Sequence, residues 1–202
     1  MIKMTRKSGK GSVPSAASAV DSAGWLRRVR RVESPNCDAR PDANDISLLV
    51  IHGISLPPGR FGGPWIDALF TNRLDPAAHP YFAGIAELRV SAHVCIDRRG
   101  VATQYVGFAQ RAWHAGVSSF EGRSRCNDFS IGIELEGTDD RAYTASQYAR
   151  LARVVAQLMA AYPQITAERI VGHSDIAPGR KTDPGASFDW SAFRRALAAA
   201  RR

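Results

Sequence analysis

The segment Gly172–Gly185 holds the residues of this chain whose types and spacing most directly suggest chemistry. His173 stands near one end of it and Asp183 near the other, with Lys181 two residues before the aspartate. Imidazole and carboxylate groups are both zinc ligands, and three protein ligands plus a water are typical of a catalytic zinc site. A third ligand must come from elsewhere, and His52, which follows an apolar run, is the first candidate. Together these residues predict a hydrolytic zinc site.

Residue types alone leave the membership of this site open. Asp175 lies two residues after His173 and could share a strand face with it, so it competes with Asp183 as the acidic ligand. Imidazole ligands could also come from the remaining histidines, which are His79, His93 and His114. Each candidate has a plain structural interpretation as well, as a hydrogen-bonded core histidine or as an ordinary turn aspartate.

Short apolar runs predict the strands that position these residues. Residues 46–51 are continuously apolar apart from Ser47 and lead directly to His52. A second short run, 170–171, leads toward His173. Both histidines therefore stand where a strand gives way to a loop.

Residues 130–136 show the clearest alternation in the chain. Three apolar side chains face one way, while Gly132, Glu134 and Glu136 face the other. With its apolar face packed on a core, such a strand presents both glutamates to a cleft or to solvent.

The remaining patterns complete an α/β domain with a mixed central β-sheet flanked by helices. They are an edge strand over 25–32, a hairpin of 90–96 and 101–106 around the turn 97–100, short helices at 64–70 and around 77–85, a helix that starts with a capping box at Thr144 and Gln147 and stops at Pro163, and a last helix capped by Asp189.

Length and charge predict one folded domain with a basic tail. A chain of 202 residues can bury a sizeable core, and its 45% apolar content is ordinary for a globular protein. Residues 1–40 carry nine basic against three acidic side chains, and the rest carries eighteen against sixteen. We therefore expect a flexible basic tail at 1–23 and a catalytic domain at 24–202. The tail offers an alternative function in nucleic-acid binding, but no nucleic-acid-binding motif supports it, so no nucleic-acid partner is expected.

The cysteines and the hydropathy favour a cytoplasmic protein. The three cysteines are odd in number and include no Cys-x-x-Cys pair, which is typical of reduced thiols. The basic N-terminus is not followed by the apolar segment of a signal peptide. No apolar run approaches transmembrane length, so no membrane span is expected. We expect a monomer.

Six segments between Trp25 and Leu197 occur in an order that matches a known family. They are residues 50–59, 61–66, 88–93, 111–116, 126–138 and 172–185. Together they resemble the AmpD-type 1,6-anhydro-N-acetylmuramyl-L-alanine amidases, which have the amidase and peptidoglycan-recognition-protein fold. One departure is Gly53, where the family often has asparagine, which affects one polar contact near the substrate.

The resemblance implies specific roles for five residues. His52, His173 and Asp183 match the family's ligands for one Zn²⁺ per chain, which leaves Asp175 as a structural residue of the loop. Glu134 matches the catalytic glutamate, and Lys181 matches the lysine that precedes the aspartate ligand.

The implied reaction is hydrolysis of the amide between 1,6-anhydro-N-acetylmuramic acid and L-alanine in an anhydro-muropeptide, in cytoplasmic peptidoglycan recycling. Candidate substrate contacts are Arg89 and Arg125, whose guanidinium groups suit peptide carboxylates, and Trp113, whose indole face suits a sugar ring. A non-catalytic peptidoglycan-binding module is the alternative within the same fold. Such a protein is expected to lack a ligand or the glutamate, and here all five positions are filled.

Overall fold

The computed structural model describes residues 19–202, and its centre is a six-stranded mixed sheet. Strands β4 and β5 are antiparallel, while every other neighbouring pair is parallel. The strands, in spatial order, are β1 (Arg30–Arg31), β5 (Ala102–Gln104), β4 (Val94–Ile96), β9 (Ser130–Glu136), β3 (Leu48–Ile54) and β10 (Ile170–Gly172). Two small antiparallel sheets pair β2 (Cys37–Ala39) with β6 (Gln110–Ala112) and β7 (Ser119–Phe120) with β8 (Arg123–Ser124).

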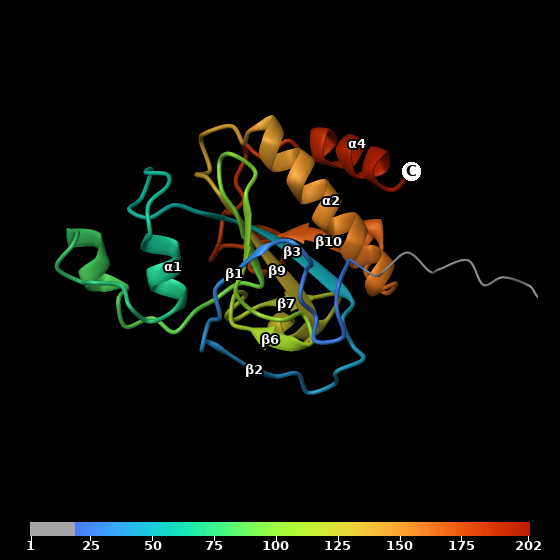
Figure 1. Cartoon of the computed structure of the whole chain (residues 1–202), viewed down its shortest axis with the longest axis horizontal. Coiled ribbons are helices and arrows are strands. Elements are labelled where there is room, and N and C mark those ends of the chain that lie inside the picture. Colours follow the sequence, from blue (N-terminus) through green and yellow to red (C-terminus); the bar gives the residue numbers. More distant parts are fainter. Residues whose placement is uncertain (1–18) are drawn as a thin grey trace, which may run out of the picture.

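Helices flank this sheet, which confirms the predicted α/β class. The long helices α2 (Ala145–Ala161) and α4 (Trp190–Ala200) lie side by side along it (Figure 1). Helix α1 (Trp65–Phe70) lies in the arm drawn at the left of Figure 1. The short helices are α3 (His173–Ile176) and three 3₁₀ turns, η1 (Pro80–Gly84), η2 (Cys126–Asp128) and η3 (Ala167–Arg169).

The main core forms between the sheet and α2 because the central strands alternate. The odd-numbered side chains of β3 and β9 point into this core and are fully buried; they are Leu49, Ile51, Ile131, Ile133 and Leu135. Helix α2 packs an apolar stripe against these strands, in which Leu151, Val155 and Leu158 are fully buried. This packing fixes which face of each strand is left for a site.

The even-numbered residues of β3 and β9 share the opposite face of the sheet. The two strands are parallel and in register, so that Val50 pairs with Gly132 and His52 pairs with Glu134. The predicted alternation over 130–136 is confirmed by strand β9, which has the same bounds. The register therefore brings a histidine and a glutamate together that are 82 positions apart in the sequence.

Several predicted elements are confirmed at their ends. Thr144 and Gln147 form the capping box of α2, and Tyr162, just before Pro163, is its C-cap. Asp189 caps α4 by accepting a hydrogen bond from the Ala192 N–H at 2.8 Å. The hairpin of β4 and β5 turns at the predicted residues.

Three predictions were wrong in extent. The strand expected over 25–32 is limited to Arg30–Arg31, because Arg28 adopts a left-handed φ of 59° that interrupts an extended chain. The helix expected around 77–85 is the 3₁₀ turn Pro80–Gly84, because His79 before the proline is extended. His52 does not stand at the exit of its strand, since β3 continues to Ile54.

The expected tail at residues 1–23 lies mostly outside the described residues. Within 19–23, Val20 is 7% exposed and pairs with Leu26, so packing on the core begins before residue 24. Across residues 19–202, no helix is long and apolar enough to span a membrane.

Candidate metal centre

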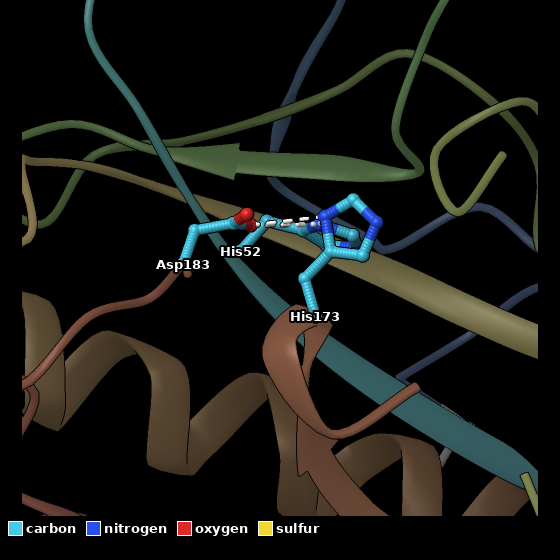
Figure 2. A group of neighbouring side chains, drawn as sticks. All are labelled: His52, His173 and Asp183. Carbon is cyan, nitrogen blue, oxygen red and sulfur yellow. Dashed lines mark hydrogen bonds and ion pairs between the residues drawn. The ribbon is translucent and has the colours of Figure 1, made fainter. Parts of the chain in front are cut away.

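His52, His173 and Asp183 converge from three different elements (Figure 2). His52 comes from β3, His173 is the first residue of α3, and Asp183 lies in the loop that follows. The two histidine Nδ1 atoms are 3.0 Å apart. The Asp183 Oδ2 atom lies 3.2 Å from Nδ1 of His52 and 3.1 Å from Nδ1 of His173. Three potential ligand atoms thus form a nearly equilateral triangle.

The loop that carries Asp183 is fixed by hydrogen bonds to its backbone. The Ser174 N–H donates to the Asp183 carbonyl at 3.0 Å, and the Tyr143 hydroxyl donates to the Pro184 carbonyl at 2.9 Å. Asp175 is committed elsewhere, because its Oδ2 accepts a hydrogen bond from the Gly172 N–H at 2.7 Å. Asp183, and not Asp175, is therefore the carboxylate that faces the two imidazoles.

The geometry of the triangle fits a tetrahedral metal ion. Ligand bonds of about 2.1 Å place the corners of a tetrahedron about 3.4 Å apart, close to the separations of 3.0 to 3.2 Å found here. Two nitrogens and one carboxylate oxygen are a donor set that suits zinc, and three ligands leave a fourth corner open.

The other nitrogen of each histidine is also engaged. Nε2 of His173 donates to the Ala115 carbonyl at 3.2 Å, and Arg180 donates to the same carbonyl at 2.7 Å. Nε2 of His52 lies 2.9 Å from Nδ1 of His114. Both rings are therefore held with Nδ1 toward the centre.

Burial and the contacts within the triangle set the charges of His52 and Asp183. It lowers the pKa of His52 to about 4, although the Asp183 carboxylate opposes the shift, so this imidazole is neutral at pH 7. Burial alone would raise the pKa of Asp183, but its close contacts with Nδ1 of His173 and Nδ1 of His52 hold that pKa well below its usual range. A neutral imidazole and an ionised carboxylate are the states that bind metal.

Glu134 is placed beside the triangle and is unusual for a carboxylate. It is only 9% exposed, and its Oε2 atom has no hydrogen-bond partner among the described residues. Burial raises its pKa well above the ordinary value, the charge of Asp183 adds to this shift, and the charge of Lys181 opposes it. Such an atom is available to a water or substrate.

These groups line one cavity of about 590 Å³. Lys181 and Trp113 belong to its wall, which also includes Ser55, Leu56, Tyr81, Ile85, Leu88, Val90, Thr138 and Asp139. The indole of Trp113 is held at its edge, because Nε1 donates to Asp38 at 3.2 Å. The wall thus combines an apolar side with the charged cluster.

The two arginines expected to contact substrate are outside this wall. Arg89 lies between the lining residues Leu88 and Val90 and forms an exposed ion pair with Glu87 at 3.5 Å. Arg125 is 70% exposed and pairs with Asp128 at 3.2 Å. Neither guanidinium group is brought to the metal triangle.

The remaining histidines do not join the triangle. Nδ1 of His79 accepts a hydrogen bond from the Tyr81 N–H, and Nδ1 of buried His93 accepts one from the Gly132 N–H. His114 contacts a ligand instead of acting as one. Spacing could not identify this contact, although residues 111–116 are one of the segments that carry the family resemblance.

Residues 42–186 match the model of the N-acetylmuramoyl-L-alanine amidase family, and the chain belongs to this family of amide hydrolases. Within it, the chain is 67% identical over 171 residues to the 1,6-anhydro-N-acetylmuramyl-L-alanine amidase AmpD of Citrobacter freundii, which covers 85% of this chain and 91% of the relative. It is an AmpD-type amidase by sequence, as the resemblance indicated.

Solved structures agree with this assignment. A crystal structure of a selenomethionine derivative of AmpD has a TM-score of 0.85 and 65% identity, covering 88% of this chain and 98% of that one. The Escherichia coli amidase AmiD was solved in complex with anhydro-N-acetylmuramic acid-L-Ala-D-gamma-Glu-L-Lys; it has a TM-score of 0.56 and 27% identity, covering 88% of this chain and 65% of that one.

Proposed function

We propose that this chain uses one zinc ion to hydrolyse the amide bond between 1,6-anhydro-N-acetylmuramic acid and L-alanine in muropeptides. The observation that carries this proposal is the triangle of His52, His173 and Asp183 beside a buried Glu134 oxygen that has no hydrogen-bond partner in the described part of the chain. The high identity to AmpD supports the bond and the substrate. The AmiD complex supports them too, since a protein of this fold binds such a ligand.

The three residues of the triangle would hold the ion through two Nδ1 atoms and one Oδ2 atom. When bound, zinc polarises an amide carbonyl and lowers the pKa of a coordinated water toward about 7. The part of the chain is to keep the His52 imidazole neutral by burial and to hold the Asp183 carboxylate ionised.

Glu134 is the proposed general base and acid. Its Oε2 atom accepts a proton from the attacking water and returns that proton to the nitrogen of the leaving L-alanine. Burial beside Asp183 raises the pKa of this carboxyl, and a general acid and base is most efficient when its pKa lies near the operating pH. The charge of Lys181 opposes this shift, which favours the ionised form of Glu134 that acts as the base.

Lys181 is the proposed electrostatic partner of the carbonyl oxygen. That oxygen gains negative charge as water adds to the amide carbon, and a cation fixed in the cavity wall stabilises it. Trp113 offers its indole face to the sugar. Arg89 and Arg125 lie beyond the wall, and we propose that they contact carboxylates of the peptide stem farther from the bond that is cleaved.

We further propose that residues 24–202 form the catalytic domain of a monomer that acts in cytoplasmic peptidoglycan recycling. The three cysteines are free, which suits a reducing compartment. Cell fractionation tests the compartment, and light scattering of the purified protein tests the monomer.

Product analysis tests the reaction. Purified protein of known metal content is incubated with an anhydro-muropeptide and, separately, with an intact N-acetylmuramyl peptide, and the products are identified by mass. We expect the anhydro substrate to yield the free anhydro sugar and a peptide that begins with L-alanine. Binding without product release would favour the non-catalytic module and reject the proposal.

A further inference from the structure

Two consecutive residues, His114 and Ala115, contact the Nε2 atoms of the two histidines of the metal triangle. The Ala115 carbonyl accepts a hydrogen bond from Nε2 of His173 at 3.2 Å, and Nδ1 of His114 lies 2.9 Å from Nε2 of His52. The side-chain oxygen of Asn127 accepts hydrogen bonds from both backbone N–H groups, at 3.1 Å from His114 and at 2.8 Å from Ala115. One amide therefore anchors the whole supporting segment.

The hydrogen-bond partner of Nε2 determines which tautomer each imidazole ring adopts. A carbonyl can only accept, so Ala115 requires the proton of His173 to be on Nε2, which leaves the Nδ1 lone pair facing the centre. A metal bound at the triangle requires the same tautomer of His52, with the lone pair on Nδ1 and the proton on Nε2. Its Nε2 proton needs an acceptor, and Nδ1 of His114 is the atom in position to accept it.

The ring of His114 is itself fixed at two points. Its Nε2 atom lies 3.2 Å from the hydroxyl of Ser130, which can accept the proton that this nitrogen carries when Nδ1 is the acceptor. Its ring packs against Gly132, where an added Cβ would come within 2.4 Å of the ring Cγ. Ser130 and Gly132 belong to β9, the strand that also carries Glu134.

We propose that His114 is a positioning residue that holds His52 in the Nε2–H tautomer with Nδ1 aimed at the metal, and that Ser130 supports it. The inference rests on the zinc site proposed above. Groups that orient a metal ligand in this way typically change metal affinity or activity about 10- to 100-fold.

The test measures zinc affinity of the full chain by competition with a chromophoric chelator. His114→Phe keeps a ring over Gly132 but removes the acceptor, and we expect it to weaken zinc binding about 10- to 100-fold. His114→Asn offers an amide oxygen near the position of Nδ1, and we expect it to recover most of the lost affinity. The Co²⁺ absorption spectrum, which reports ligand geometry, should change in His114→Phe and return in His114→Asn.

His93→Asn is the matched control. It also removes a fully buried imidazole near the same strand, yet it can still accept the hydrogen bond from the Gly132 N–H and contacts no ligand. We expect its zinc affinity to stay close to that of the wild type. Thermal unfolding of every zinc-free variant separates loss of stability from loss of metal binding.

Ser130→Ala provides a second, gentler probe that does not depend on the folding of His114→Phe. We expect a several-fold loss of affinity in the wild-type background and no further loss in His114→Phe, because two residues of one chain of contacts are not additive. An unchanged affinity in Ser130→Ala would contradict the role of Ser130.

The outcomes separate this inference from the proposed function. A wild type that binds no zinc overturns both. A wild type that binds zinc while His114→Phe binds it equally well overturns only the role of His114. A similar loss in His93→Asn and His114→Phe would also overturn it, because the effect would then be a general loosening of the core.

Discussion

Glu134 and Glu136 lie on the same face of β9 but differ in their hydrogen bonding and therefore in their roles. Both point away from the apolar core, and both are buried. The carboxylate of Glu136 accepts hydrogen bonds from the backbone N–H groups of Gly62 and Arg98, whereas one oxygen of Glu134 has no partner within residues 19–202. At the scale of the residue, the satisfied carboxylate is structural and the unsatisfied one is available for chemistry.

Replacing Glu134 by Gln should therefore abolish most turnover without unfolding the protein. The amide keeps the shape of the side chain but cannot accept a proton, so we expect kcat to fall about 10²- to 10⁴-fold with zinc content unchanged. Steady-state hydrolysis of anhydro-muropeptide, with metal analysis, measures both quantities. Glu136→Gln is the control: it should lower thermal stability and leave turnover of the folded protein near normal. The opposite pattern would exchange the two roles.

Lys181→Ala tests the proposed stabilisation of the carbonyl oxygen. By analogy with other groups that stabilise an oxyanion, we expect a loss of about 10²- to 10³-fold in kcat and little change in zinc affinity. Lys181→Arg, which keeps the charge, should retain more activity than the alanine variant. Wild-type turnover in Lys181→Ala would remove this residue from the mechanism.

The sequence alone could supply the types of residue in the metal triangle but not its members. Asp175 and Asp183 were equal candidates by spacing, and only the family resemblance favoured Asp183. The reason becomes visible in three dimensions, because the Asp175 carboxylate accepts from the Gly172 N–H while Asp183 turns toward His52 and His173. The contact between His114 and His52 joins the segment after β6 to the interior of β3, and it left no local signal in the sequence.

Among the helices and strands, the alternation of apolar residues and the capping residues were sufficient to predict elements that depend on one short segment. Strand β9 and the capping box of α2 could be predicted because each depends on residues within one short segment. The register between β3 and β9 could not be predicted, since it depends on the packing of both strands against α2. The edge strand was predicted, but its restriction to Arg30–Arg31 was not, because the left-handed Arg28 gives no pattern in the sequence.

The cap of α2 gives an element-scale prediction about stability. The Thr144 hydroxyl accepts a hydrogen bond from the Gln147 N–H at 3.1 Å and donates to the Arg98 carbonyl at 2.8 Å. We expect Thr144→Ala to lower the free energy of unfolding by about 1–2 kcal/mol, and Thr144→Ser to recover most of it. Chemical denaturation measures the change, and equal stability of Thr144→Ala and wild type would contradict the role of this cap.

For the whole molecule, buried neutral histidines predict sensitivity to acid. Burial, with the nearby charge of Arg40, lowers the pKa of His93 from its ordinary value of 6.5 to about 3. As pH falls below 6.5, the unfolded chain takes up a proton that the folded chain refuses, so stability is lost between these two values and is unaffected above them. The share of His93 is about 2 kcal/mol between pH 7.5 and pH 5.

Chemical denaturation of zinc-free protein at these two pH values checks this prediction. His93→Asn should be less sensitive to acid than the wild type by about the same 2 kcal/mol. Its unfolding free energy at pH 7.5 serves as the reference for each protein. An equal loss of stability in both proteins would show that His93 does not remain neutral in the fold.

The proposed metal centre is tested most directly by a zinc titration of metal-free protein, followed by hydrolysis of anhydro-muropeptide at each step. If His52, His173 and Asp183 hold one catalytic ion, activity should rise in proportion to added zinc and level off at about one equivalent per chain. His52→Ala should show neither tight binding nor activity. Full turnover by metal-free wild type, or an equal stoichiometry and affinity in His52→Ala, would contradict the proposed centre.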